Sequence, residues 1–302
     1  MSLLNNLIVS SLPIIPKPIV GFVAGRYIAG AQFDDAARVT KNLNAQRIMA
    51  TMDLLGEDVF DHSEAATAKD AYKEILRSIH REHLDSNLSL KLTQIGLKLD
   101  KSFCEQNLRE ILLVAKDKKN FIRIDMEDHT CTDTTLDLYK SVRRDFENAG
   151  VAIQAYLRRS QADVLELVKQ RANFRLCKGI YIEPEAIAFK GREEIRNNFL
   201  SLLRIMLDRG AYVGVATHDD VLIDASCRII AERKLSPDKY EFQMLLGVRE
   251  KLRLKLRENG HRVRVYVPFG RQWYPYSVRR LKENPAIAGY ALKTLFSKDS
   301  VN

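Results

Sequence analysis

The stretch "FIRIDME", residues 121 to 127, alternates apolar and charged side chains. Its two faces carry Ile122, Ile124 and Met126 on one side and Arg123, Asp125 and Glu127 on the other. This two-residue period predicts a β-strand. Because strands of parallel sheets are normally buried on both faces, the charged face needs compensation, either by an internal ionic layer or by a polar ligand.

Seven further strand-like runs recur along the chain: 47–54, 88–95, 151–157, 174–179, 212–218, 240–245 and 263–269. Helical patterns alternate with them: 64–84, 103–118, 133–149, 160–170, 191–209, 219–233 and 247–259. Eight strands that alternate with helices predict a closed α/β barrel of the (β/α)8 TIM type. A doubly wound open sheet is the alternative, but no GxGxxG turn follows any of the strand-like runs.

Composition indicates a globular chain, since 46% of the 302 residues are hydrophobic and 29% are charged. No linker, repeat or low-complexity tract divides it, so we expect an N-terminal helical segment over 1–45 and one catalytic barrel domain over 46–302. Prolines interrupt the apolar stretch 7–25, which argues against a membrane span. No secretory signal is recognised, and we expect a cytoplasmic protein.

The cysteines and histidines predict no metal site. Cys104, Cys131, Cys177 and Cys227 are widely spaced and form no CxxC pair, which is typical of reduced thiols in a reducing compartment. His80 and His83 lie three residues apart and are interpreted as a pair on a helix surface.

The net charge of +9 is concentrated at the carboxyl end, because residues 249–302 contain thirteen Lys or Arg and four Asp or Glu. Such a segment suits a nucleotide cofactor, an anionic membrane surface or nucleic acid. No recognised nucleic-acid module accompanies it, so nucleic acid is not expected as a partner. Within it, Tyr276, Arg279, Arg280 and Glu283 share one face of a predicted helix over 274–284, which is either a functional face or a solvated flank.

Polar side chains also occur where several predicted strands end. These are Lys91, Asp125, Gln154 and Tyr266. Since barrels of this type place their active sites at the carboxyl ends of the strands, we expect these side chains to surround a polar ligand.

Seven strings occur in an order that resembles the proline dehydrogenase family: "SLKLTQIG", "IRIDMEDHTCTDTTL", "VAIQAYLRRSQADV", "RLCKGIYIEP", "VATHDD", "YEFQMLLGVRE" and "VYVPFGRQWYPYSVRRLKENP". They extend from about residue 40 to 290. The length is similar to that of the monofunctional bacterial type and leaves no room for a fused aldehyde dehydrogenase.

The resemblance implies a barrel that binds FAD noncovalently at the carboxyl ends of its strands, with the final helix over the barrel mouth. It implies oxidation of L-proline to Δ1-pyrroline-5-carboxylate, with hydride passing to the flavin and electrons to membrane quinone. Pyrroline-5-carboxylate dehydrogenase would be the pathway neighbour. We expect the basic carboxyl-terminal part to contact the inner face of an anionic membrane.

The resemblance assigns proline binding to six side chains: Lys91, Leu245, Tyr266, Tyr276, Arg279 and Arg280. The two arginines and Lys91 would hold the carboxylate, which guanidinium groups bind in bidentate fashion. The tyrosines would shape the pocket around the ring, and Leu245 would cover its apolar side. Asp125 would sit beside Lys91 and complete the catalytic set with Tyr276; a buried ion pair retained for structure is the alternative.

The resemblance assigns FAD binding to ten positions: Gln154, Arg175, Lys178, Gly179, Ile180, Tyr181, Thr217, His218, Gln243 and Glu283. Gln154 would hydrogen-bond the flavin ring, and Arg175 and Lys178 would face its electron-rich edge or the phosphates, where a cation stabilises the reduced anion. The sequence departs from the family at Ile180, where Ala is common, and at Cys177, where Val is common.

Two other functions stay open from the sequence. One is a barrel flavoenzyme that oxidises another cyclic imino acid, such as hydroxyproline or pipecolate. The other is a basic protein without catalytic activity that binds nucleic acid or phospholipid.

Overall fold

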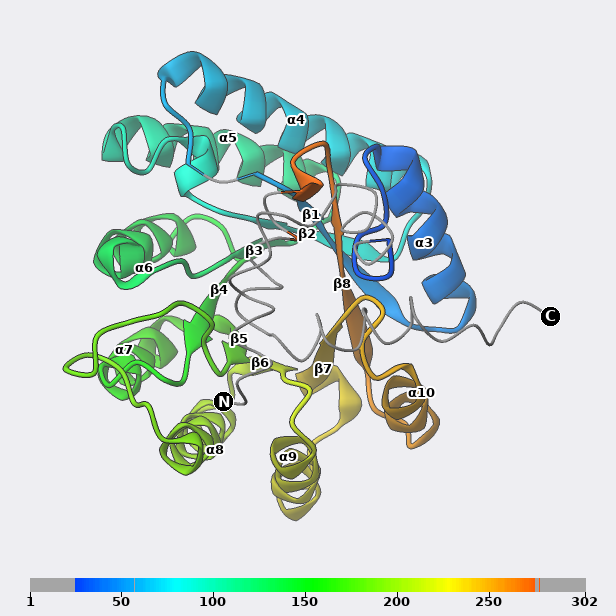
Figure 1. Ribbon diagram of the computed structural model, residues 1–302, viewed down its shortest axis with the longest axis vertical. Coiled ribbons are helices and arrows are strands. Elements are labelled where there is room, and N and C mark those ends of the chain that lie inside the picture. The colour runs from blue at the N-terminus through cyan, green and yellow to red at the C-terminus, as the bar shows by residue number, and fades with distance from the viewer. Residues whose placement is uncertain (1–24, 57, 275–276, 278–302) are drawn as a thin grey trace, which may run out of the picture.

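The computed structural model describes residues 25–56, 58–274 and 277, and within them eight parallel strands close into a barrel (Figure 1). The strands are β1 (Met49–Leu54), β2 (Ser86–Leu90), β3 (Ile122–Ile124), β4 (Ala149–Gln154), β5 (Asn173–Cys177), β6 (Tyr212–Ala216), β7 (Tyr240–Leu245) and β8 (Val263–Phe269). They pair in sequential order, and β1 also pairs with β8. The predicted barrel is confirmed, and the open sheet is excluded by this closure.

Helices surround the strands as an outer ring (Figure 1). In the described part of the chain they are α3 (Phe33–Ala45), α4 (His62–Arg81), α5 (Lys101–Asp117), α6 (His129–Arg143), α7 (Ser160–Leu167), α8 (Arg192–Asp208), α9 (Asp220–Glu232) and α10 (Glu250–Glu258). Aspartates begin four of them, because a carboxylate at the N-cap accepts a backbone N–H of the first turn. These caps are Asp61, Asp100, Asp128 and Asp219.

Some predicted boundaries are wrong at the ends of the elements. The predicted helix 133–149 ends at Arg143, because Ala149 and Gly150 are paired with β3 in the barrel ladder. The predicted strand 88–95 ends at Leu90 and is followed by a short 3₁₀ helix, η2 (Thr93–Ile95). Tertiary pairing therefore decides where these elements stop, which local propensity does not indicate.

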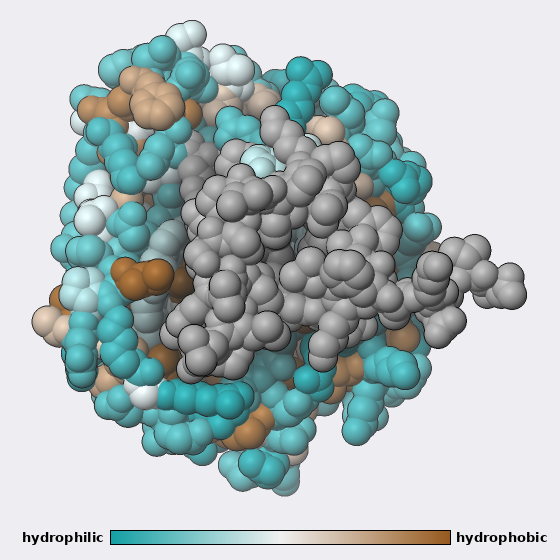
Figure 2. All heavy atoms as spheres, viewed as in Figure 1, coloured by the Kyte–Doolittle hydropathy of each residue, from teal (hydrophilic) through white to brown (hydrophobic). Residues whose placement is uncertain are grey.

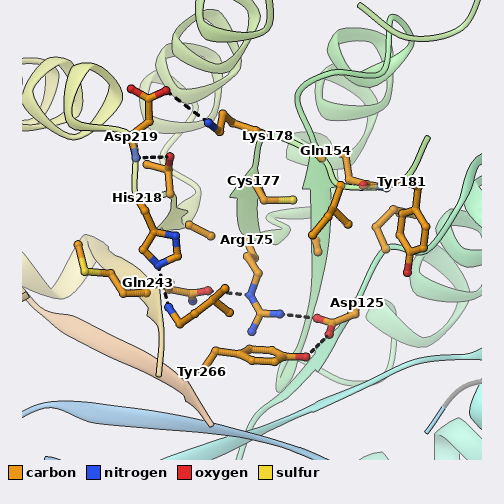
Figure 3. A pocket seen from close by; sticks show the side chains of 18 of the residues that line it. Asp125, Gln154, Arg175, Cys177, Lys178, Tyr181, His218, Asp219, Gln243 and Tyr266 are labelled. Carbon is orange, nitrogen blue, oxygen red and sulfur yellow. Dashed lines mark hydrogen bonds and ion pairs between the residues drawn. The ribbon is translucent and has the colours of Figure 1, made fainter. Parts of the chain in front are cut away.

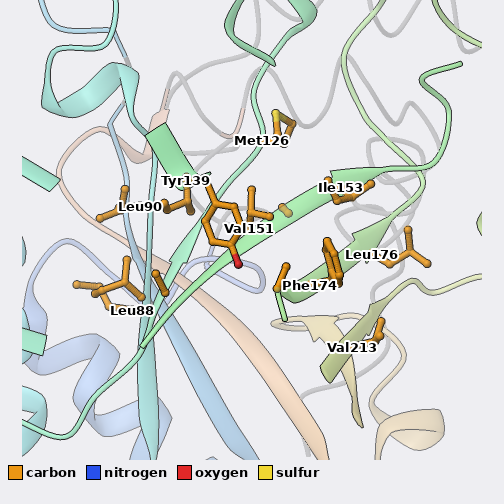
Figure 4. Close-up of a cluster of buried hydrophobic side chains, with 14 of the residues drawn as sticks. Leu88, Leu90, Met126, Tyr139, Val151, Ile153, Phe174, Leu176 and Val213 are labelled. Atoms are coloured by element: carbon orange, nitrogen blue, oxygen red, sulfur yellow. The ribbon is translucent and has the colours of Figure 1, made fainter. Parts of the chain in front are cut away.

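The apolar faces of the strands form the core between barrel and helices (Figure 4). Side chains from β2, β4, β5 and β6 contribute: Leu88, Leu90, Val151, Ile153, Phe174, Leu176 and Val213. Tyr139 of α6 belongs to the same buried cluster. Burial of this apolar surface is the main favourable contribution to folding. The outer surface differs, since most of the coloured side chains in Figure 2 are hydrophilic.

The polar faces of the strands point into the barrel, as the alternation predicts. At its amino-terminal end, Glu241 of β7 accepts hydrogen bonds from Arg264 of β8 at 2.8 Å and Tyr212 of β6 at 2.8 Å. We call these three residues the floor cluster. Both Glu241 and Arg264 are buried, so the ion pair is shielded from water.

Two glycines make room for long polar side chains inside the barrel. A Cβ atom at Gly150 would lie 2.4 Å from Nη1 of Arg123, and one at Gly214 would lie 2.4 Å from Nε2 of Gln243. Real Cβ atoms essentially never approach so closely. Each glycine therefore lets the side chain of a nearby strand cross the interior.

The segment before β1 packs on the seam of the barrel. Helix α3 contacts β1 and β8, and the backbone of Ala29 donates a hydrogen bond to Pro268 O at 2.9 Å. Of the N-terminal segment expected over 1–45, residues 1–24 lie outside the described residues. The same holds for most of the helix expected over 274–284.

Candidate active site

A cavity of about 930 Å³ opens at the carboxyl ends of the strands (Figure 3). Thirteen residues selected from the sequence line it: Lys91, Asp125, Gln154, Arg175, Lys178, Gly179, Ile180, Tyr181, Thr217, His218, Gln243, Leu245 and Tyr266. These are all of the selected residues that the structure describes. Tyr276, Arg279, Arg280 and Glu283 lie outside the described residues, and their roles stay predictions.

Asp125 lies at the centre of a hydrogen-bonded group on one side of the cavity (Figure 3). Its carboxylate accepts from Ser89 Oγ at 2.7 Å and Tyr266 OH at 2.8 Å, and it forms an ion pair with Arg175. Burial opposes the charge of Asp125, but Arg175 and Lys91 lower its pKa below the ordinary value. The group therefore holds an ionised carboxylate beside the cavity.

Lys91 forms a buried ion pair with Asp53, whose Oδ1 lies 3.3 Å from the Lys91 Nζ. Burial and the charge of Asp125 raise the pKa of Asp53, whereas Lys91 lowers it. The sequence predicted that Asp125 holds Lys91 in position, and Asp125 does interact with Lys91 through its charge. Asp53, which forms the ion pair, was not predicted. The alternation of Thr51 and Asp53 with apolar residues in the run 47–54 was the signal that could have found it. We call Lys91, Asp53, Asp125 and Arg175 the mouth cluster.

Gln154 ends β4 with its side chain buried at the cavity wall. Its Nε2 donates to Glu127 O at 2.8 Å, which fixes the orientation of the carboxamide. The same residue's backbone oxygen accepts from Ser160 Oγ at 2.6 Å. The bond from Ser160 fixes the backbone where β4 ends, and the bond to Glu127 holds the carboxamide beside the cavity.

His218 follows β6 and is neutral. Its Nε2 accepts the backbone N–H of Leu245 at 2.9 Å, so the ring proton lies on Nδ1. Burial, together with the charges of Lys178 and Arg249, lowers its pKa to about 4. His218 thus presents an uncharged ring to the cavity at neutral pH.

Asp219 organises the cationic rim of the cavity, a role that the sequence analysis missed. Its carboxylate contacts Arg196 at 2.8 Å and Lys178 at 3.3 Å and also caps α9. Burial opposes its charge, but these cations lower its pKa to about 2. An aspartate as the first residue of the helical pattern 219–233 was the available signal, because aspartate is a preferred N-cap.

The connection from β5 to α8 is held by contacts with Tyr156 and His129. At Gly179 φ is +108°, and a Cβ atom there would lie 1.9 Å from the Tyr156 ring, so glycine is required. The buried Glu183 accepts from the backbone N–H of His129 at 2.9 Å and from Tyr156 OH at 3.4 Å. Ile180 is 40% exposed at the rim, so its bulk is accommodated.

Fold and site together define an α/β-barrel protein with a charged ligand cavity at the catalytic end of the strands. Residues 36–291 match the family described as proline dehydrogenase. "Proline dehydrogenase 1" of Bacillus subtilis (strain 168) is 39% identical over 275 residues, which cover 91% of each chain. "Proline dehydrogenase" of Deinococcus radiodurans is 34% identical over 276 residues, which cover 90% of this chain and 89% of the relative. The chain therefore belongs to the proline dehydrogenase family, an oxidoreductase family of proline catabolism.

Solved structures support the fold. Proline utilization A from Bdellovibrio bacteriovorus, inactivated by N-propargylglycine, aligns with a TM-score of 0.82 and 24% identity over 92% of this chain. A mutant of the Bradyrhizobium japonicum protein aligns with a TM-score of 0.74 and 20% identity. This chain spans about a third of those longer chains, 34% and 32%.

Proposed function

We propose that the chain oxidises L-proline to Δ1-pyrroline-5-carboxylate with noncovalently bound FAD. The observation that carries the proposal is the convergence of thirteen residues, selected from seven strands and their following segments, on one cavity. Family membership supports the substrate, since the curated relatives of similar length are named proline dehydrogenases.

The cavity fits FAD in size and in chemistry. Its volume of about 930 Å³ lies at the upper end of the range for small-molecule and cofactor sites. Arg175 and Lys178 would face the electron-rich edge or the phosphates, and the fixed carboxamide of Gln154 would hydrogen-bond the ring. When bound, FAD would supply the acceptor for the hydride of proline.

The protein's own part in the reaction is to orient proline. Lys91, with Arg279 and Arg280, would bind the carboxylate through charge-assisted hydrogen bonds. Tyr266 and Tyr276 would enclose the ring, and Leu245 would cover its apolar side. Asp125 would hold Arg175 and Tyr266 in place, while the amine of proline loses its proton to solvent, so we assign no general base.

An absorption spectrum tests this function. The purified protein is expected to be yellow and to bleach when L-proline is added. Faster bleaching with trans-4-hydroxy-L-proline than with L-proline would show that hydroxyproline is the preferred substrate. A folded protein that is colourless and takes up no added FAD would overturn the proposal.

We further propose that the electrons pass to membrane quinone and that the cytoplasmic chain contacts the inner membrane face through its basic end. No helix in the described part of the chain is long and apolar enough to span a bilayer. The basic excess of residues 249–302 would instead bind anionic lipid at the surface. The product would pass to pyrroline-5-carboxylate dehydrogenase. Vesicle binding that is insensitive to lipid charge and to salt would contradict the membrane contact.

A further inference from the structure

A continuous line of hydrogen bonds joins the floor cluster to the cavity. Arg264 Nε donates to Glu241 Oε1 at 2.8 Å, and Gln243 Nε2 donates to the same oxygen at 2.6 Å. At its other end, Gln243 Oε1 accepts from Arg175 Nε at 2.7 Å. The line thus ends at a guanidinium that lines the cavity.

Glu241 acts in this line as an acceptor. Its carboxylate accepts hydrogen bonds from three donors, the third being Tyr212 OH at 2.8 Å. Burial opposes the charge of Glu241, but Arg264 and the other donors lower its pKa to about 2. An ionised carboxylate has no proton to give, so every neighbour must turn a donor toward it.

This property fixes the orientation of the Gln243 carboxamide. A carboxamide carries donors on one side and an acceptor on the other, and its two orientations are similar in shape. With Glu241 ionised, the NH₂ group must face Glu241, and the carbonyl oxygen must face Arg175. The reversed orientation would set oxygen against oxygen at one end and N–H against N–H at the other.

The Arg175 guanidinium is held in turn. Its Nε is bound by Gln243, while its Nη1 donates to Ser89 Oγ at 3.1 Å and pairs with Asp125. Gly214 leaves the space that the Gln243 side chain fills, since a Cβ atom there would lie 2.4 Å from Gln243 Nε2. Gln243 is 6% exposed, so most of its side chain is enclosed by the protein.

We propose that Glu241 is a positioning residue for the reaction: it sets the Gln243 carboxamide so that this group aligns the guanidinium of Arg175 with the cavity. The proposal rests on the proposed function for its kinetic consequence. It extends the site to a residue at the opposite end of the barrel, which itself does not line the cavity.

A double-mutant cycle on the whole protein tests the proposal. Glu241→Gln gives the side chain a donor and frees Gln243 to reverse, and Gln243→Met removes the link while keeping the Glu241–Arg264 pair. We expect each change to lower kcat/KM for L-proline about tenfold and the double variant to lose no more than either single variant. Fully additive losses would overturn the proposal.

Matched variants separate positioning from stability. Tyr212→Phe also removes a hydrogen bond to Glu241 but leaves Gln243 bound, and we expect kcat/KM to change less than about twofold. Glu241→Asp keeps the charge beside Arg264 but shortens the reach to Gln243. If Glu241→Gln does not fold, Glu241→Asp takes its place in the cycle. Fully additive losses of kcat/KM in that cycle would likewise overturn the proposal.

A second measurement needs no turnover. In protein labelled with ¹⁵N-arginine, the Nε–H signal of Arg175 is identified by its absence in Arg175→Lys. We expect its exchange with water to accelerate about tenfold in the Glu241 variant and to stay unchanged in Tyr212→Phe. Unchanged exchange in the Glu241 variant would overturn the positioning role. A parent protein that fails to oxidise proline but gives the expected exchange would overturn only the proposed function.

Discussion

The two ends of the barrel interior carry similar charges in different settings. Glu241 and Arg264 of the floor cluster are buried and hydrogen-bonded to each other, and neither residue lines the cavity. The mouth cluster is also largely buried, yet Lys91, Asp125 and Arg175 border the cavity. Only the charges of the mouth cluster therefore reach a ligand directly, whereas those of the floor act through other side chains.

The largest expected effect concerns the floor. Arg264→Met leaves the Glu241 carboxylate buried without its cation, and we expect the free energy of unfolding to fall by about 4 kcal/mol. Loss of this cation also favours a protonated Glu241, which can donate to Gln243, so kcat/KM for proline is expected to fall by up to the tenfold expected for Glu241→Gln. Chemical denaturation and steady-state kinetics measure both.

The control for this change is an ion pair on the outside of the barrel. Arg233 binds Asp208 at 2.7 Å with side chains that are 24% and 55% exposed. Arg233→Met is expected to cost about 0.5 kcal/mol. Equal losses of stability at the two sites would remove the distinction between floor and surface.

A pH effect of similar size is expected at the mouth. The pKa of His218 is about 4 in the folded chain and 6.5 as the ordinary value. As the pH falls from 6.5 to 4, the unfolded chain binds a proton there that the folded chain does not, so His218 lowers the stability by up to about 3 kcal/mol over this window. In His218→Gln, which keeps an acceptor for Leu245 N–H, stability should fall less steeply with acid.

Measuring unfolding at several pH values tests this expectation. His80→Gln serves as the matched control, since His80 is exposed on α4. An equal slope in the parent and in His218→Gln would contradict a neutral, buried His218.

Lys91→Met tests the mouth cluster directly. Removing the cation expected to bind the carboxylate should lower kcat/KM for L-proline about a hundredfold, mainly through KM. The yellow colour should persist. A small change in KM together with a large loss of stability would instead assign the pair of Lys91 and Asp53 to structure.

The smallest effect is expected at the rim. Ile180→Ala removes a side chain that is 40% exposed, and we expect the affinity for FAD to change less than about threefold. Titration of the flavin-free protein with FAD measures it. A change above tenfold would show that the rim, like the mouth cluster, determines binding.

The sequence predicted the barrel well because polar and apolar residues alternate strictly in its strands, as in β3 and β8. The same alternation placed Asp125 and Tyr266 at the cavity. Asp53 was missed although Thr51 and Asp53 alternate with apolar residues in the run 47–54. The orientation of Gln243 could not be predicted, since it depends on Glu241 of the same strand and on Arg175, which lies 68 positions away in β5.

The hydrogen bond between Tyr266 and Asp125 joins residues that are 141 positions apart. During synthesis from the amino terminus, β8 emerges after the other seven strands, so the cavity is completed only when the barrel closes. Before that point β1 and β7 are open sheet edges that can pair with other chains. A chain truncated before β8 would therefore be prone to aggregate, and closure of the seam protects the protein as well as assembling its site.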